Sequence, residues 1–125
     1  NTGAGGFGSA YFASREFGFG ASAGGWSSNT VFPRMMADVN GDGRDDIVGF
    51  GNDGILVALA RADGTFAAAQ LRTTGFGFDA SAGGWSSNTA FPRMTADLNA
   101  DGRDDIVGFG NAGVLTALST TDWIV

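Results

Sequence analysis

Two short acidic segments carry the residues of this chain that are best suited to chemistry. The first runs from Asp38 to Asp46 and the second from Asp97 to Asp105. In each, oxygen-bearing side chains occupy the first, third, fifth and ninth positions, and a glycine occupies the sixth. Oxygen ligands at this spacing are typical of calcium-binding loops, because the glycine permits a sharp turn and brings the next carbonyl inward. The segments therefore predict two calcium sites.

The two segments do not have the form of EF-hands. An EF-hand loop ends with a bidentate Glu at its twelfth position, where this chain has Gly49 and Gly108, and helices flank it. Here the flanks are short apolar runs broken by glycine, which indicates strands. We therefore expect each loop to join two β-strands. A solvated acidic turn is the alternative, and a second copy with the same ligand spacing favours metal.

The composition narrows the possible partners. The chain has 125 residues, a formal net charge of −6, and no Cys or His. This charge argues against nucleic acid and anionic membrane as partners, and no apolar run is long enough to cross a membrane. The chain begins at Asn1 without a Met or a signal peptide, and we interpret it as mature or excised. Most of its carboxylates lie in the two loops, so folding should be linked to calcium.

An internal repeat organises the whole chain. Residues 17–59 align with residues 76–118 at a spacing of 59 positions, and 35 of these 43 positions are identical. The register extends to the N-terminus, where Gly5, Phe7 and Ala10 correspond to Gly64, Phe66 and Ala69. We predict a single region over 1–125, with repeat units at about 1–59 and 60–118 and a tail at 119–125.

The pattern of each repeat unit predicts four short strands and no helix. In the first unit we expect strands at Arg34–Ala37, Ile47–Phe50, Ile55–Ala60 and Ala67–Arg72, joined by the acidic loop and by Gly-containing hairpin turns. A four-stranded antiparallel unit at this spacing predicts one β-propeller blade per period. Two blades cannot close a ring and would expose two apolar faces. We therefore expect a homo-oligomer, such as three chains forming six blades, or a piece of a longer chain.

The run 37–51, Ala-Asp-Val-Asn-Gly-Asp-Gly-Arg-Asp-Asp-Ile-Val-Gly-Phe-Gly, resembles the FG-GAP/VCBS repeats of integrin-like propellers. The longer pattern adds Gly-Gly-Trp and Phe-Pro-Arg-Met before the loop, and it is similar to the propeller lectins of the Psathyrella velutina type. That resemblance implies an extracellular, calcium-containing lectin. It also implies that N-acetylglucosamine-type or sialylated glycans bind between adjacent blades, with calcium shaping the blade.

The resemblance also implies a set of metal ligands. They are Asp38, Asn40, Asp42, Arg44 (carbonyl) and Asp46 in the first loop, and Asp97, Asn99, Asp101, Arg103 (carbonyl) and Asp105 in the second. Asp45 and Asp104 occupy a variable position, and we expect them to face solvent. Two features depart from the pattern: Phe32 and Phe91 stand where a His often precedes the Pro, and Ala100 replaces Gly41, so the second loop should be strained or weaker.

Sugar binding would use aromatic rings for C–H faces, and amide or guanidinium groups for hydroxyls. The candidates are Trp26, Trp85, Arg34, Arg93, Asn52 and Asn111. Each has a structural alternative: the Trp residues could pack between blades, the Arg residues could form salt bridges, and the Asn residues could serve their turns. Trp123 has no counterpart in the repeat, and we expect it at an edge or interface.

A lectin is the leading hypothesis, and a structural or adhesion propeller that binds protein is the second. The Gly-Gly-Trp and Phe-Pro-Arg segments favour the lectin, because a calcium blade alone does not need them. An enzyme is the third hypothesis. Outside the loops the carboxylates form no convincing acid–base pair, and Cys and His are lacking, so we expect no catalytic activity.

Overall fold

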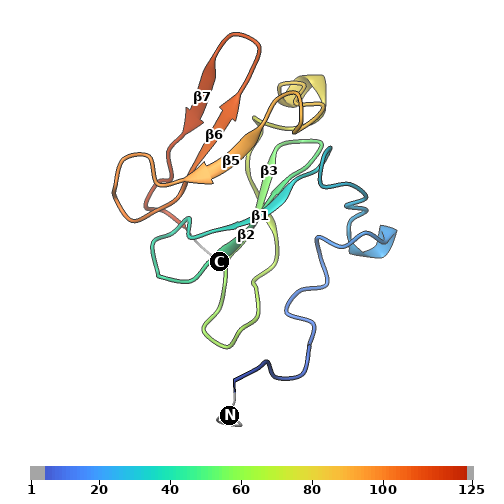
Figure 1. The fold of residues 1–125 in the computed structure, drawn as a ribbon, viewed down its shortest axis with the longest axis vertical. Coiled ribbons are helices and arrows are strands. Elements are labelled where there is room, and N and C mark those ends of the chain that lie inside the picture. Colours follow the sequence, from blue (N-terminus) through green and yellow to red (C-terminus); the bar gives the residue numbers. More distant parts are fainter. Residues whose placement is uncertain (1–4, 124–125) are drawn as a thin grey trace.

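The computed structural model describes residues 5–123 and shows a chain built from β-strands and loops (Figure 1). Its strands are β1 (Arg34–Ala37), β2 (Asp46–Phe50), β3 (Ile55–Ala58), β4 (Gln70–Thr73), β5 (Arg93–Ala96), β6 (Asp105–Phe109) and β7 (Val114–Ala117). Two single-turn 3-10 helices, Ala21–Ala23 and Ala80–Ala82, interrupt the long connections. No helix in the described range is both long and apolar enough to cross a membrane.

The strands form two antiparallel sheets, one in each repeat unit. Strands β1–β2–β3–β4 make the first sheet in sequence order, and β5–β6–β7 make the second. The repeat extends to the register, since Arg34 pairs with Gly49 and Arg93 pairs with Gly108. The all-β class and the blade-like antiparallel units expected from the sequence are therefore confirmed, although the second unit has three strands within residues 5–123.

The main core lies between the two sheets. The side of the first unit that packs against the second unit is its front face, and the opposite side is its back face. The same names apply to the corresponding sides of the second unit. The front face of the first unit consists of Val39, Phe50, Ile55 and Leu59, whose exposed fractions are 4% or less. The back face of the second unit, which packs against it, consists of Phe76, Trp85, Phe91 and Ile106. This packing positions one unit against the other.

A smaller hydrophobic cluster forms the back face of the first unit, which no other unit covers in the described structure. That face consists of Phe17, Trp26, Phe32 and Ile47, which are the repeat counterparts of the residues in the main core. Its Trp26 ring lies 5.2 Å from the ring of Phe17 and 6.2 Å from that of Phe32, measured between centroids. The same aromatic arrangement therefore recurs in both units, once between sheets and once on an open side.

The predicted strands differ from the observed ones mainly in the last hairpin of the first unit. Strand β3 ends at Ala58, two residues earlier than expected, and β4 covers Gln70–Thr73 where Ala67–Arg72 was expected. Ala60 makes only an isolated bridge to Phe66, and the pairing of β3 with β4 shifts between Ile55 and Leu56. A bulge of this kind cannot be read from alternation alone, because it inserts a residue without changing composition.

Candidate functional site

The first acidic loop is curled around the side chain of Asp38. One carboxylate oxygen accepts hydrogen bonds from the backbone N–H groups of Gly41 (2.8 Å) and Asp42 (3.2 Å), and the other accepts one from Gly43 (2.8 Å). In the second loop, Asp97 accepts the equivalent bonds from Asp101 (3.2 Å) and Gly102 (2.9 Å). The first aspartate of each loop therefore organises its turn.

The last aspartate of each loop joins the loop to the sheet. Asp46 is fully buried, and it accepts hydrogen bonds from the backbone N–H groups of Val39 (3.0 Å) and Ala60 (2.8 Å). Burial raises the pKa of the Asp46 carboxyl, and the nearby carboxylates of Asp42 and Asp38 raise it further. A buried acid among like charges is the kind of group that a bound cation stabilises.

Asp105 occupies the same place in the second unit. It is also fully buried and accepts hydrogen bonds from the backbone N–H groups of Leu98 (2.8 Å) and Ser119 (2.8 Å). Single oxygens of Asp97, Asp101 and Asp105 all lie within 4.8 Å of one another. This second loop is the one place among residues 5–123 where three acidic groups approach so closely.

Asparagine side chains complete both loops. The Asn40 Oδ1 atom is buried and has no hydrogen-bond partner in the described part of the chain. The Asn99 amide lies 3.0 Å from one Asp101 oxygen and 3.3 Å from an oxygen of Asp97. An amide oxygen could approach carboxylate oxygens this closely if they shared a cation, and otherwise the amide nitrogen would donate to them. The donor set of both loops therefore suits a hard cation.

Two expectations about the loops can be compared with the structure directly. Ala100 has a φ angle of 60°, in the left-handed region, so the expected strain at this position is present. Asp45 is exposed as expected, but Asp104 is half-buried, because its carboxylate accepts a hydrogen bond from the Asp38 N–H at 2.9 Å. The eighth loop position therefore faces the neighbouring unit in the second loop only. The sequence does not show this difference, because both loops have Asp at that position.

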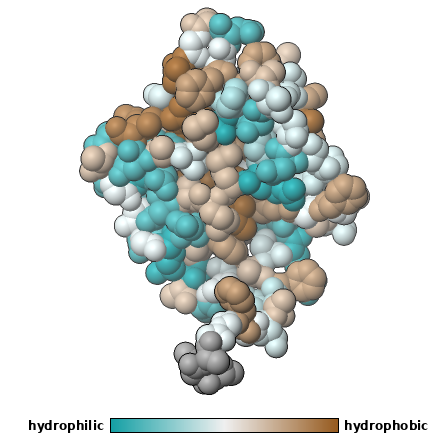
Figure 2. All heavy atoms as spheres, viewed as in Figure 1, coloured by the Kyte–Doolittle hydropathy of each residue, from teal (hydrophilic) through white to brown (hydrophobic). Residues whose placement is uncertain are grey.

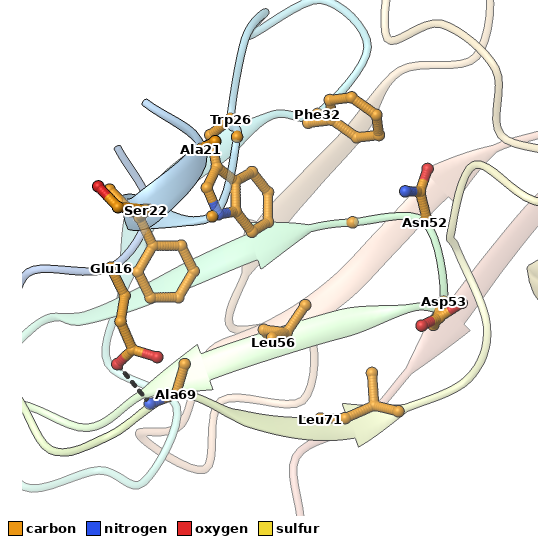
Figure 3. A pocket seen from close by; sticks show the side chains of 15 residues that line it. Glu16, Ala21, Ser22, Trp26, Phe32, Asn52, Asp53, Leu56, Ala69 and Leu71 are labelled. Carbon is orange, nitrogen blue, oxygen red and sulfur yellow. Dashed lines mark hydrogen bonds between the residues drawn. The ribbon is translucent and has the colours of Figure 1, made fainter. Parts of the chain in front are cut away.

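A pocket of about 590 Å³ opens on the back face of the first unit. The Trp26 ring and the side chains of Leu56 and Leu71 belong to its apolar lining, and Asn52 and Asp53 lie at the turn between β2 and β3 (Figure 3). The carboxylate of Glu16 lines the opposite side, where it accepts a hydrogen bond from the Ala69 N–H at 2.9 Å. The pocket thus combines an aromatic ring, aliphatic groups and polar groups.

An arginine holds the aromatic wall of this pocket in place. Phe17 has a φ angle of 62°, which is unusual for a residue with a bulky side chain. Its carbonyl accepts a hydrogen bond from the Arg34 Nη1 atom at 2.8 Å. Phe17 and Trp26 are both largely buried, with exposed fractions of 8% and 9%. Arg34 therefore fixes the backbone from which the wall is built, and it does not itself line the pocket.

Arg93 has the same role in a more buried setting. Its Nη1 atom donates to the Phe76 carbonyl at 2.9 Å, and its Nη2 atom donates to the Val31 carbonyl of the first unit at 3.4 Å. The guanidinium also lies 5.3 Å from the centroid of the Phe50 ring. Burial lowers the pKa of Arg93 to about 10. Arg93 therefore joins the two units and is not placed to contact a ligand.

The structure separates the six predicted sugar-binding residues into two groups. Trp26 and Asn52 both line the pocket. Trp85 belongs to the core between the sheets, and Asn111 lies in an exposed turn. Neither Arg residue lines a pocket described here. Trp123 packs at the edge of the main core, as expected, with the Arg72 guanidinium 5.0 Å from its ring centroid.

Sequence reasoning missed Glu16 and Asp53 as pocket residues. Both interrupt the repeat, because Gly75 and Ala112 stand at the corresponding positions. Polar residues that depart from an otherwise close repeat are a signal that could have identified them. The part that Leu56 and Leu71 play had no such signal, since apolar residues are expected in any strand.

The chain belongs to the FG-GAP-like repeat family, whose family model matches residues 38–108, more than half of its length. The structure is also similar to that of a lectin from Agrocybe aegerita, described as recognising non-reducing terminal N-acetylglucosamine. The two share 43% sequence identity at a TM-score of 0.70, over 84% of this chain and 25% of the lectin chain. No curated protein matches the chain. The expected resemblance to propeller lectins with FG-GAP-type repeats is thereby confirmed.

Proposed function

Starting from this membership of the FG-GAP-like repeat family, we propose that the chain binds carbohydrate, and in particular glycans that end in N-acetylglucosamine. The observation that carries the proposal is the 43% identity to an N-acetylglucosamine-recognising lectin over 84% of this chain. The chain spans about a quarter of that lectin's length, so the proposal concerns the site that this part of the fold contains.

The pocket beside Trp26 has the chemistry that such a sugar needs. An aromatic ring and aliphatic side chains can contact C–H groups and the methyl of an acetamido group, while amide and carboxylate groups can satisfy hydroxyls. Trp26 and Leu56 supply the first kind of surface, and Asn52, Asp53 and Glu16 supply the second. A volume of about 590 Å³ lies within the range of small-ligand sites.

The charge of the lining favours a neutral sugar over a sialylated one. Glu16 and Asp53 are both acidic, and the described lining of this pocket includes no Arg. The carboxylate of sialic acid would meet two like charges without a cation to offset them. Within the two sugar classes expected from the sequence, we therefore favour terminal N-acetylglucosamine. The proposal is one of binding without turnover.

We propose further that the two acidic loops hold Ca²⁺, which would stabilise the blades without contacting the sugar. The support is the buried, unpartnered Asn40 Oδ1 atom, the close approach of Asp97, Asp101 and Asp105, and the raised pKa of Asp46. The ligands in each loop would be the side-chain oxygens and the arginine carbonyl predicted from the sequence. Calcium would supply the positive charge that lets these carboxylates lie together.

The carbohydrate proposal is tested by calorimetric titration with an N-acetylglucosamine-terminated oligosaccharide in millimolar calcium. We expect N52A to weaken binding at least tenfold, because it removes a polar group from the pocket. The same change in the second unit, N111A, should leave affinity unchanged, because that exposed turn lines no pocket described here. Equal affinities for both variants would contradict this site. No binding by the unaltered chain would favour the protein-binding alternative.

The calcium proposal is tested separately, by thermal unfolding with calcium and with a chelator. Mass action predicts about 2.7 kcal/mol of stabilisation for each site at a hundredfold excess of calcium over its Kd. D101N should reduce calcium affinity at least tenfold, whereas D63N, in an exposed turn outside the loops, should not. An unchanged melting temperature after chelation, with no heat of calcium binding, would contradict the proposal.

A further inference from the structure

The front face of the second unit is open, although the same face is buried in the first. Phe109 and Val114 are 42% and 59% exposed, whereas their counterparts Phe50 and Ile55 are 0% and 1% exposed. The whole front face of the second unit consists of Leu98, Phe109, Val114 and Leu118, each at least 42% exposed. Hydrophobic residues also gather at the surface over β7 (Figure 2). An exposed patch of this kind marks an interaction surface.

The surface that fits this face is already present on the same molecule. The back face of the first unit is the repeat counterpart of the surface that covers Phe50 and Ile55 inside the chain. We propose that the front face of one chain docks on the back face of a second copy, with the geometry that joins the two units within the chain. Each chain would then contact the next head to tail.

The sheet of the second unit has an open edge that this docking would fill. In the first unit β3 pairs with β4, and Ile55 lies opposite Thr73. In the second unit β7 has no strand beyond it among residues 5–123. The repeat counterpart of β4 is the segment 11–14, which forms no strand in the described structure. We infer that this segment of one copy pairs with β7 of its partner.

The segment 11–14 is already held beside the place where it would be needed. The Ala13 carbonyl accepts a hydrogen bond from the Phe66 N–H at 3.0 Å, and the Tyr11 hydroxyl donates to the Gly64 carbonyl at 2.9 Å. Tyr11 and Phe12 are nevertheless 66% and 72% exposed. Because the segment is positioned but has no strand partner in the described structure, docking would require little reorganisation of its backbone.

Hydrogen bonds between the first and second units show which polar contacts the proposed docking of two copies would repeat. Asp104 and Asp38 exchange two hydrogen bonds, from the Asp38 N–H to the Asp104 carboxylate at 2.9 Å and from the Asp104 N–H to the Asp38 carbonyl at 2.7 Å. Asp97 and Asp45 are the repeat counterparts of Asp38 and Asp104, so the proposed contact would place Asp97 of one copy opposite Asp45 of the next. Three more backbone bonds cross the interface, from the N–H groups of Phe78, Asp79 and Asn88 to the carbonyls of Gly51, Asn52 and Thr30, in addition to the bond from Arg93 to Val31.

The pocket beside Trp26 lies on the back face, so the docked copy would border it. Within the chain, the turn at Asn52 accepts the Asp79 N–H at 3.0 Å and thereby holds the loop before Trp85. The backbone carbonyl of Asn111 in a partner would hold the loop before Trp26 in the same way, and this contact would not use the Asn111 side chain. The inference does not depend on which ligand the pocket takes, and it can be tested without any glycan.

Sedimentation velocity over a range of concentrations is the first test. We expect assemblies whose masses are multiples of 12.7 kDa, and at least tenfold weaker association for V114D, which places a charge on the front face. Val114 is exposed in the single chain, so the variant should keep its fold and circular dichroism spectrum. A62D adds the same charge in an exposed turn and should associate normally. A monomeric parent chain, or equal association of both variants, would overturn the proposal.

Cysteine cross-linking tests the register, because the parent chain contains no Cys. Within the chain, Ile55 of β3 pairs with Thr73 of β4. The repeat counterparts of these residues are Val114 and Ser14, so Val114 of one copy should lie opposite Ser14 of the copy that docks on it. A mixture of S14C and V114C chains should form a disulfide-linked dimer under mild oxidation. A mixture of S14C with A62C should not, because those positions are out of register. Equal cross-linking in both mixtures, or none in the first, would contradict the strand pairing.

Discussion

The two repeat units have nearly the same sequence and yet lie in different environments. Residues 17–59 and 76–118 are identical at 35 of 43 positions, and their strands pair in the same register. Phe50 is nevertheless fully buried, while Phe109 is 42% exposed. The difference arises because a second unit follows the first and covers its front face. Burial is therefore set by the neighbour, and a blade of this kind is a complete structure only between two others.

The arginines that follow the two prolines show the same effect in a polar group. Arg34 and Arg93 both donate to the carbonyl of a phenylalanine seventeen residues earlier. Arg93 is 1% exposed and also reaches Val31 of the first unit, whereas Arg34 is half-buried and makes no contact of this kind in the described structure. One residue type thus supports a loop in one unit and joins two units in the other.

The largest expected effect comes from removing the buried ring. F50A should lower the free energy of unfolding by about 3–5 kcal/mol, because it leaves a cavity between the sheets. F109A should cost no more than about 1 kcal/mol when it is combined with V114D, which should weaken association and leave the Phe109 ring partly exposed. Urea unfolding followed by tryptophan fluorescence measures both. Equal losses would show that the two front faces are equally covered.

The arginine pair should give a smaller contrast. R93A should destabilise the chain by about 1–3 kcal/mol, since it leaves the Phe76 and Val31 carbonyls without a buried donor. R34A should cost about 1 kcal/mol or less, because solvent can reach the group that it exposes. The two variants are compared by urea unfolding in calcium. A larger loss for R34A would contradict the distinct roles given to these residues.

The smallest effects concern the left-handed residue in each acidic loop. A100G should raise the free energy of unfolding by about 1 kcal/mol, because glycine adopts a φ of 60° without strain. G41A should lower it by at least about 1–2 kcal/mol, since its φ is 75° and an added Cβ would lie 3.1 Å from Arg103 Cγ. Thermal unfolding in saturating calcium measures both. If the two loops share one backbone conformation, the two substitutions must change the free energy of unfolding in opposite directions.

Much of the fold follows from local patterns in the sequence. The acidic loops, the glycine turns and the short apolar runs predicted antiparallel units, and strand β1 has the predicted bounds. The start of β4 was placed three residues too early, because the shift between Ile55 and Leu56 depends on packing with the neighbouring strand. The role of Asp104 was also missed, since its partner Asp38 lies 66 residues away in the sequence.

The candidate site was only partly predictable. The metal ligands are set by spacing within one loop, so the sequence alone could group them. The sugar candidates come from segments that the fold brings together, and only Trp26 and Asn52 line the same pocket. Trp85 has the same local sequence as Trp26, but it faces the first sheet and joins the core. Identical motifs thus gave identical predictions for two residues whose surroundings differ.

The repeat, the blade-like class and the two acidic loops follow from the sequence, because the spacing of motifs along the chain specifies them. Three properties required the folded structure: which face of each unit is covered, which tryptophan lines a pocket and which arginine is buried. Those properties depend on what lies against a residue from elsewhere in the molecule. In a repeated sequence this distinction is clear, since the local signal is the same in both units and only the neighbours differ.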